Sequence, residues 1–152
     1  MPVKVLMVCL GNICRSPLAE GILKSKVNPS EIVVDSAGTA GYHIGKGPDI
    51  RSIEVAQRAG IDISHQKCRR FIPDDFDNFD YIFAMDRENL LHLKDLARNT
   101  ADLEKLYLLL EEAGIPGEEV PDPYYGGNDG FQKVFRMIDA ATDKLLPLLS
   151  KS

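Results

Sequence analysis

A cysteine, an arginine and a serine lie within one short segment near the start of the chain. Cys9 is followed after five residues by Arg15, and Ser16 comes next. The apolar run 3–8 before the segment predicts a buried strand, and Pro17 beyond it favours the start of a helix. Backbone N–H groups in such a loop, with the positive end of the helix dipole, can surround a phosphate group. The segment therefore suggests both a ligand and a nucleophile.

The residue types in this loop suit an attack on phosphorus. Cys9 attacks well as a thiolate, and the surrounding N–H dipoles favour that charged form. Arg15 has a planar fork of donors that can bind two phosphoryl oxygens at once, a geometry that lysine lacks. Gly11 allows close approach of the backbone, and Asn12 tolerates the left-handed conformation that turns neighbouring N–H groups inward. Ser16 can donate a hydrogen bond to the sulfur of Cys9.

The expected phosphate-binding loop consists of Leu10, Gly11, Asn12, Ile13 and Cys14. Three other interpretations of the segment stay open. Cys9 can be a small buried core residue. Cys9 and Cys14 can be metal ligands, although their spacing and the lack of a neighbouring His or Cys pair fit zinc poorly. The loop can also bind phosphate without turning it over. We expect no metal and no cofactor.

A second segment, far along the chain, carries an acid between two prolines. Asp122 is followed, after a proline, by Tyr124 and Tyr125. Cleavage of a phosphate ester needs a proton on the departing oxygen, which a positioned aspartate can deliver. The tyrosine rings can wall a cleft around a flat side chain. These residue types are also common in plain turns, so the catalytic interpretation depends on the presence of the Cys9 loop.

Length and charge limit the class of the protein and its partners. The 152 residues are 44% apolar and 27% charged, which predicts one globular domain over 1–152. A net charge of −5 argues against nucleic acid and anionic membranes as partners. We expect neither a signal peptide nor a membrane span. The three cysteines lack a disulfide spacing, which favours a cytoplasmic location, and Cys68 has no assigned role.

Apolar strands alternate with amphipathic helices, a pattern that predicts an α/β domain with a parallel sheet covered on both faces. We expect strands at 3–8, 32–34, 81–84 and 106–109. Helices are expected from Ser16 as N-cap, from about Asp49 to Gly60, from near Asp86, and over 131–149 with Asn128 or Asp129 as cap. Ligands of open α/β sheets bind at the carboxyl ends of the strands, where the Cys9 loop begins.

Five segments in sequence order resemble the low-molecular-weight protein tyrosine phosphatase family. They are VCLGNICRSPLAE near the N-terminus, VDSAGT at 34–39, GIDISHQ at 60–66, FDYIFAMD at 79–86 and DPYYGG at 122–127. The cysteine loop at the N-terminus, with its acid far downstream, is specific to this family. The resemblance implies a three-layer, flavodoxin-like sandwich, in which helices flank a four-stranded parallel sheet of order 2-1-3-4.

The resemblance also implies an activity. The protein would be a metal-independent protein tyrosine phosphatase that hydrolyses phosphotyrosine through a phosphocysteine intermediate. Cys9 would attack phosphorus, and Arg15 would bind the phosphoryl oxygens and stabilise the transition state. Asp122 would protonate the leaving phenol and then activate water. The expected partners are a protein carrying phosphotyrosine and a phosphate or other oxyanion in the loop. We expect a monomer, with a weak dimer as the alternative.

Further positions match the family by resemblance. The residues that match a network supporting the loop are Asn12, Ser16, Ser36 and His65, and those that match the substrate cleft are Tyr42, Tyr124 and Tyr125. Many relatives have tryptophan where this chain has Tyr42, so the substrate preference at this edge of the cleft stays open. Cys14 matches a cysteine that can form a disulfide with Cys9 under peroxide, a reversible guard against deeper oxidation. Alternatively, Cys14 only packs.

Three other functions compete with this one. Some bacterial relatives hydrolyse phosphoarginine, but they have threonine at the position of Ile13 and lack the pair Tyr124 and Tyr125. Arsenate reductases use a similar loop but need additional cysteines, and Cys68 has no partner at a plausible spacing. A non-catalytic phosphate or phosphoprotein sensor is the third, although a sensor would not need every catalytic residue.

Overall fold

A parallel sheet forms the centre of the protein. The computed structural model describes residues 2–115, 119–124 and 128–150. Its strands are β1 (Val3–Cys9), β2 (Ile32–Gly38), β3 (Tyr81–Ala84) and β4 (Leu106–Leu108). All neighbours are parallel, and their order is β2-β1-β3-β4. This order confirms the expected sheet and places β1 in its interior.

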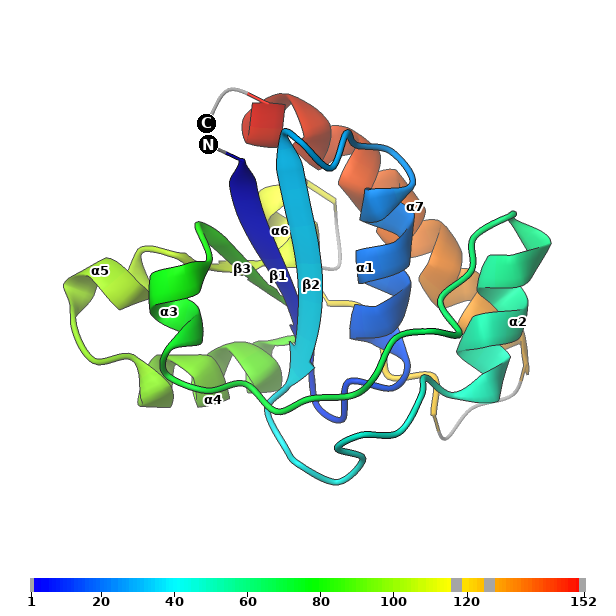
Figure 1. Cartoon of the computed structure of the whole chain (residues 1–152), viewed down its shortest axis with the longest axis horizontal. Helices are drawn as coiled ribbons and strands as arrows, with labels where there is room; N and C mark the ends of the chain where they lie inside the picture. The colour runs from blue at the N-terminus through cyan, green and yellow to red at the C-terminus, as the bar shows by residue number, and fades with distance from the viewer. Residues whose placement is uncertain (1, 116–118, 125–127, 151–152) are drawn as a thin grey trace.

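Helices cover both faces of the sheet, as expected. They are α1 (Arg15–Lys24), α2 (Ile50–Arg58), α3 (Asp75–Asn78), α4 (Arg87–Leu96), α5 (Thr100–Leu103), α6 (Leu109–Glu112) and α7 (Asn128–Ser150). Figure 1 shows α1, α2 and α7 to one side of the strands and α3, α4 and α5 to the other. The three-layer sandwich is therefore confirmed.

Alternate residues of β1 supply two separate cores, because successive side chains of a strand point to opposite faces. Val5 and Met7 belong to the core that includes residues of α1 and α7. Leu6 and Val8 belong to the second core, together with Phe76 of α3. A strand buried on both faces is apolar over its buried length, and β1 is buried from Val5 to Cys9 with only Lys4 exposed, which is why the run 3–8 predicted it correctly.

Two helix starts are confirmed and one is wrong. The carboxylate of Asp49 accepts from the N–H of Arg51 and caps α2, and Asp86 caps α4 by accepting from the N–H of Asn89. By contrast, α1 already begins at Arg15, so Ser16 is its second residue and not its N-cap. The loop turns the chain into the helix two residues earlier than expected, with Cys14 and not Ser16 at the cap position, which leaves the serine hydroxyl available for other contacts.

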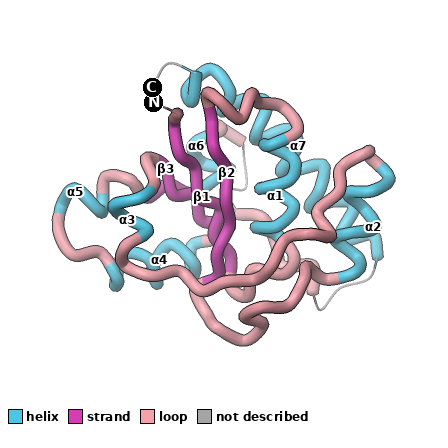
Figure 2. Tube along the Cα trace, viewed as in Figure 1, coloured by secondary structure: helices cyan, strands magenta, loops and turns pink. Residues whose placement is uncertain are grey.

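The sequence pattern also missed some regular structure. β2 extends to Gly38, beyond the apolar run 32–34, because its ladder with β1 continues as far as the pair Cys9 and Gly38. The four-residue helices α3, α5 and α6 are too short to show helical periodicity. In Figure 2, loops gather at the lower edge of the sheet, where the strands end. None of the helices in the described ranges has the length and apolar character of a membrane span.

Gly21 of α1 provides a test of this packing. Alanine normally stabilises a helix interior relative to glycine by about 1 kcal/mol. A Cβ at Gly21 would lie 2.4 Å from Cγ2 of Ile63. We therefore expect Gly21→Ala to destabilise the protein by about 1–3 kcal/mol in urea denaturation. The loss should shrink in an Ile63→Ala background, which removes the obstructing atom; an equal loss in both backgrounds would contradict this packing.

Candidate active site

A cavity of about 270 Å³ opens at the carboxyl end of β1 and contains most of the expected site residues. It is lined by Cys9, Leu10, Gly11, Ile13, Cys14, Arg15, Tyr42, His43, Asp122 and Tyr124. The fold thus brings the N-terminal cysteine loop together with the distant segment around Asp122. Tyr125, the second tyrosine expected in the cleft, lies outside the described residues.

The carbonyl groups of the loop point away from the cavity because the surrounding protein holds them. The oxygen of Cys9 accepts from the N–H of Thr39 at 2.9 Å, and that of Leu10 accepts from the N–H of Ala40 at 2.9 Å. Close packing beneath the loop makes this possible: a Cβ on Gly38 would lie 2.8 Å from the oxygen of Leu10. The expected VDSAGT segment therefore includes a glycine that the loop requires sterically.

The other half of the loop is anchored in the same way. The oxygen of Asn12 accepts from the Sγ–H of Cys68 at 2.8 Å, and the oxygen of Ile13 accepts from the N–H of Asp49 at 2.7 Å. In a trans peptide the N–H points opposite to the C=O, so each outward carbonyl turns the next N–H inward. Within the described part of the chain, the N–H groups of residues 10–14 donate to no protein acceptor. They are thus available for an oxyanion.

Asn12 adopts the left-handed conformation expected of it, with φ of 57°. Its Oδ1 accepts from the N–H of Arg69 at 3.0 Å, and its Nδ2 donates to Oγ of Ser16 at 2.8 Å. Oγ of Ser16 lies 3.0 Å from Sγ of Cys9. A thiolate has no hydrogen to donate, so when Cys9 is ionised the hydroxyl of Ser16 is the donor to the sulfur. The contacts therefore form a directed chain that presents a donor to Cys9.

Arg15 is buried, with only 2% of its surface exposed, and protein oxygens surround its guanidinium. Nη1 donates to Oδ2 of Asp86 at 2.6 Å and to the carbonyl oxygen of Val120 at 2.9 Å. Burial by itself lowers the pKa of Arg15, but the negative charges of Cys9, Asp86 and Asp122 outweigh it and raise the pKa above its ordinary value. The guanidinium therefore stays charged and is fixed in one orientation.

Asp122 is exposed at the mouth of the cavity, and a local turn sets the orientation of its carboxylate. Oδ1 accepts from the N–H of Tyr124 at 3.0 Å, so one oxygen is occupied by the turn. The other oxygen, Oδ2, lies 3.7 Å from Nη2 of Arg15. One oxygen of the carboxylate therefore faces the guanidinium of Arg15 across the cavity mouth.

Three aromatic side chains form the rim of the cavity. Tyr42 is 71% exposed and Tyr124 is 38% exposed. The ring of His43 packs edge to face against the ring of Tyr42, with 6.4 Å between the ring centroids. Exposed rings on opposite segments suit a flat substrate side chain between them.

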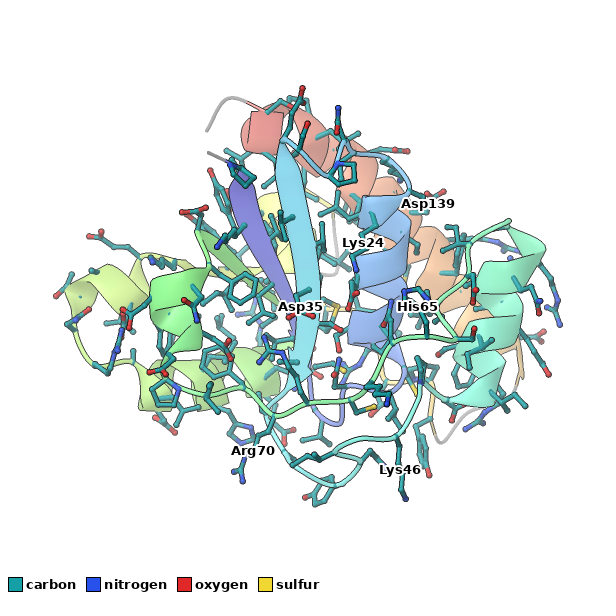
Figure 3. The ribbon with its side chains drawn as sticks, viewed as in Figure 1. Lys24, Asp35, Lys46, His65, Arg70 and Asp139 are labelled. Carbon is teal, nitrogen blue, oxygen red and sulfur yellow. The ribbon has the colours of Figure 1, made fainter. Side chains whose placement is uncertain are left out.

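The two other expected support residues lie further from the loop. Oγ of Ser36 donates to Oε1 of Glu20 at 2.6 Å, so this serine ties β2 to α1. His65 is exposed and lines a separate hollow beside α1 (Figure 3), and it makes no hydrogen bond to the loop among the described residues. Its neighbour Gln66 points to the helix instead, with Nε2 donating to the oxygen of Pro17 at 3.2 Å. The network therefore runs through Asn12 and Ser16.

The two remaining cysteines are buried neutral thiols, Cys14 within the loop and Cys68 in the segment that contacts it. Burial, reinforced by Asp49 and Cys9, raises the pKa of Cys14 far above its ordinary value. Burial also raises the pKa of Cys68 to about 11. A protonated thiol is a donor, which agrees with the contact from Cys68 to the loop carbonyl. In the described ranges no group of three or more His, Cys, Asp or Glu residues is arranged to hold a metal ion.

Sequence reasoning missed three residues of the site. The sequence predicts only that a helix begins near Asp86, and it assigns no role to His43 or Cys68. Asp86 is 71 positions away from Arg15 along the chain, and its contact depends on how β3 lies beside β1. The position of Asp86 could have predicted this contact, because an acid at the carboxyl end of a parallel strand next to β1 lies near the loop that follows β1.

The fold and site define an α/β protein with a cysteine-containing oxyanion loop. The model of the low molecular weight phosphotyrosine protein phosphatase family matches residues 4–152. The low molecular weight protein-tyrosine-phosphatase YfkJ of Bacillus subtilis is 40% identical, over 98% of this chain and 97% of that protein. The chain therefore belongs to the low molecular weight phosphotyrosine protein phosphatase family.

Solved structures agree with this assignment. The crystal structure of a protein tyrosine phosphatase from Entamoeba histolytica, with Hepes in its active site, has a TM-score of 0.92 and 38% identity, covering 98% of this chain and 97% of that one. The crystal structure of DARP, a Drosophila arginine phosphatase, has a TM-score of 0.89 and 36% identity, covering 96% and 97%. The same fold thus occurs in proteins named for two different activities.

The thiol environments predict selective alkylation. Only the thiolate reacts readily, and the raised pKa values of Cys14 and Cys68 keep these thiols protonated at pH 7–8, so both should resist iodoacetamide. Cys9 lines the open cavity beside the hydroxyl of Ser16 and should react. Peptide mass spectrometry after partial modification should locate the label on Cys9, and inorganic phosphate should slow its appearance. Labelling of Cys68 or Cys14 at a rate equal to that of Cys9 would contradict the prediction.

Proposed function

We propose that this protein hydrolyses phosphotyrosine in proteins, and aryl phosphates in general, through a phosphocysteine at Cys9. The observation that carries the proposal is the loop of inward N–H groups, which places Cys9 and Arg15 at the base of a cavity with Asp122 at its mouth. Phosphoryl transfer depends mainly on positioning and on stabilising charge on the phosphoryl oxygens. These residues supply both.

In the first step, the thiolate of Cys9 attacks phosphorus. The loop N–H groups and the Arg15 guanidinium bind the equatorial oxygens, where the guanidinium is held in place by Asp86. The S–P bond forms as the P–O bond to the phenol breaks, and protonated Asp122 gives its proton to the departing phenolate oxygen. The phenol leaves past the rim that includes Tyr42 and Tyr124.

In the second step, water hydrolyses the phosphocysteine. The carboxylate of Asp122, left by the first step, takes a proton from water as the oxygen attacks phosphorus. The S–P bond breaks, and the sulfur of Cys9 leaves as a thiolate that the hydroxyl of Ser16 stabilises. Inorganic phosphate is released, and each group returns to its starting protonation state.

Phosphoarginine is a second candidate substrate, because DARP, named an arginine phosphatase, shares the fold at 36% identity. The rim favours phosphotyrosine over it, since Tyr42 and Tyr124 offer flat faces to a phenol ring. Ile13 contributes an apolar wall to the same cavity. Side-by-side kcat/KM values on phosphotyrosine and phosphoarginine distinguish the two.

We further propose that residues 1–152 form one phosphatase domain, that the protein acts as a monomer in the cytoplasm, and that Cys14 guards Cys9 by a reversible disulfide. The family match over 4–152 supports the first of these. The burial of Cys9 and Cys14 in one loop supports the last.

The proposed roles predict a specific pattern of activity loss. The wild-type protein should hydrolyse p-nitrophenyl phosphate in the presence of a metal chelator, and Cys9→Ser should abolish turnover. Asp122→Asn should lower kcat/KM for phenyl phosphate by roughly 10²–10⁴-fold. The loss should be much smaller for p-nitrophenyl phosphate, whose phenolate leaves without a proton. Undiminished activity of Cys9→Ser would exclude the proposed function, and an equal loss of Asp122→Asn on both esters would exclude the acid role.

A further inference from the structure

Arg51, the second residue of α2, contacts the segment that carries Asp122 although it does not line the cavity. Its Nη2 donates to the carbonyl oxygen of Tyr124 at 3.2 Å. Its guanidinium lies over the ring of Tyr124, with 5.5 Å from Cζ to the centroid. The arginine thus contacts both the backbone and the side chain of the same residue. Neither contact has a part in the reaction steps above.

Arg51 is itself fixed from two sides. Nε and Nη2 donate to the two carboxylate oxygens of Asp49, each at 3.0 Å, a paired geometry that favours a single orientation. The guanidinium also lies 4.5 Å from the ring centroid of Phe131 on α7. Burial alone would raise the pKa of Asp49, but the hydrogen bonds from Arg51 outweigh it and lower that pKa, so the pair is ionised.

Asp49 connects this arginine to the phosphate-binding loop. Its N–H donates to the carbonyl oxygen of Ile13 at 2.7 Å, and Oγ of Ser52 lies 3.4 Å from the carbonyl oxygen of Cys14. On the other side, the N–H of Tyr124 donates to Oδ1 of Asp122. A continuous series of contacts therefore leads from the loop, through Asp49, Arg51 and Tyr124, to the acid.

We infer that Arg51 is a positioning residue that fixes Asp122 relative to the phosphate-binding loop through the carbonyl and ring of Tyr124. The inference rests on the proposed function, because it concerns the acid of that reaction. Without Arg51, Tyr124 loses contacts at both its carbonyl and its ring, while its N–H still holds one oxygen of Asp122. The carboxylate would then move with Tyr124 relative to the leaving group. An acid misplaced by about 1 Å can cost about 10²-fold in rate.

The experiment compares Arg51→Lys and Arg51→Ala with the wild-type protein on two aryl phosphates. We expect kcat/KM for phenyl phosphate to fall by roughly ten- to a hundred-fold, because that leaving group needs the acid. For p-nitrophenyl phosphate the fall should be several times smaller. Lysine keeps the charge but not the paired donors, so Arg51→Lys should show the same substrate dependence even if Arg51→Ala folds poorly.

A double-mutant cycle separates positioning from a merely structural role. In an Asp122→Asn background, Arg51→Lys should cause little further loss on phenyl phosphate, since a residue that acts through Asp122 has no effect once the acid is gone. Thermal unfolding of each variant gives the stability change separately. Arg58→Lys on the same helix is the matched control, because Arg58 is exposed and makes no contact with the acid segment among the described residues.

The outcomes are distinct for each claim. If the wild-type protein hydrolyses neither phenyl phosphate nor p-nitrophenyl phosphate, the proposed function is wrong. If the wild type is active but Arg51→Lys and Arg51→Ala lose activity equally on both esters, or if the losses add in the Asp122→Asn background, Arg51 has no positioning role. Unchanged kinetics in both Arg51 variants would also overturn the inference.

Discussion

The site depends on the outward anchoring of the loop carbonyls between Cys9 and Cys14. A short loop with free backbone geometry would hydrogen-bond to itself or to water, and its N–H groups would point in many directions. Here Thr39, Ala40, Asp49 and Cys68 each hold one carbonyl, and Asn12 accepts a left-handed backbone conformation to keep the loop closed. These contacts are made before any ligand arrives, so the cost of orienting the dipoles is met during folding.

The anchors come from segments that are distant in sequence, and this explains why the fold is needed. Thr39 and Ala40 follow β2, Asp49 precedes α2, and Cys68 lies in the segment bridged to Gly38. Parallel pairing of β1 with β2 over its full length brings the end of β2 beneath the loop. Pairing of β1 with β3 places Asp86 beside Arg15. Each neighbour of β1 thus contributes to one part of the site.

Acidic side chains hold the two arginines near the site in place, and both arginines stay charged. Arg15 is buried between Asp86, the carbonyl of Val120 and the more distant Asp122, so its position is set by protein groups that do not react with phosphorus. The second arginine, Arg51, is ionised beside Asp49 and lies behind Tyr124, outside the cavity. One arginine therefore lines the cavity, and the other contacts the segment that carries Asp122.

Local patterns predicted the parts of the structure that depend on local physics. The apolar run before Cys9 predicted the central strand, and the helix starts expected at about Asp49 and near Asp86 are confirmed, because burial and helix starts leave clear signals in a few residues. The predicted start of α1 lies two residues too late, because the hydroxyl of Ser16 contacts Cys9 and Asn12 and does not cap the helix. The sequence motifs predicted the Cys9 loop and Asp122 as site residues, and in the structure both line the same cavity.

Contacts between distant segments could not be predicted in this way. Nothing near Cys68 in the sequence indicates that its thiol reaches the carbonyl of Asn12, and nothing near Arg51 indicates its contact with Tyr124. Such contacts depend on the register of the sheet and the path of the loops that follow it. A motif match can also mislead about position. The match predicts that His65 supports the loop, whereas in the structure Asn12 and Ser16 form that network and His65 lines a separate hollow.

The central claim is that Cys9 becomes covalently phosphorylated during turnover. The most direct measurement is rapid denaturation at neutral pH of the Asp122→Asn variant reacting with p-nitrophenyl phosphate, followed by peptide mass spectrometry. In this variant the good leaving group still departs, while hydrolysis of the intermediate is slowed, so the intermediate should accumulate. The account predicts one phosphoryl group on the peptide that contains Cys9. Release of p-nitrophenol with no phosphoryl group on Cys9, or with the group on another residue, would contradict it.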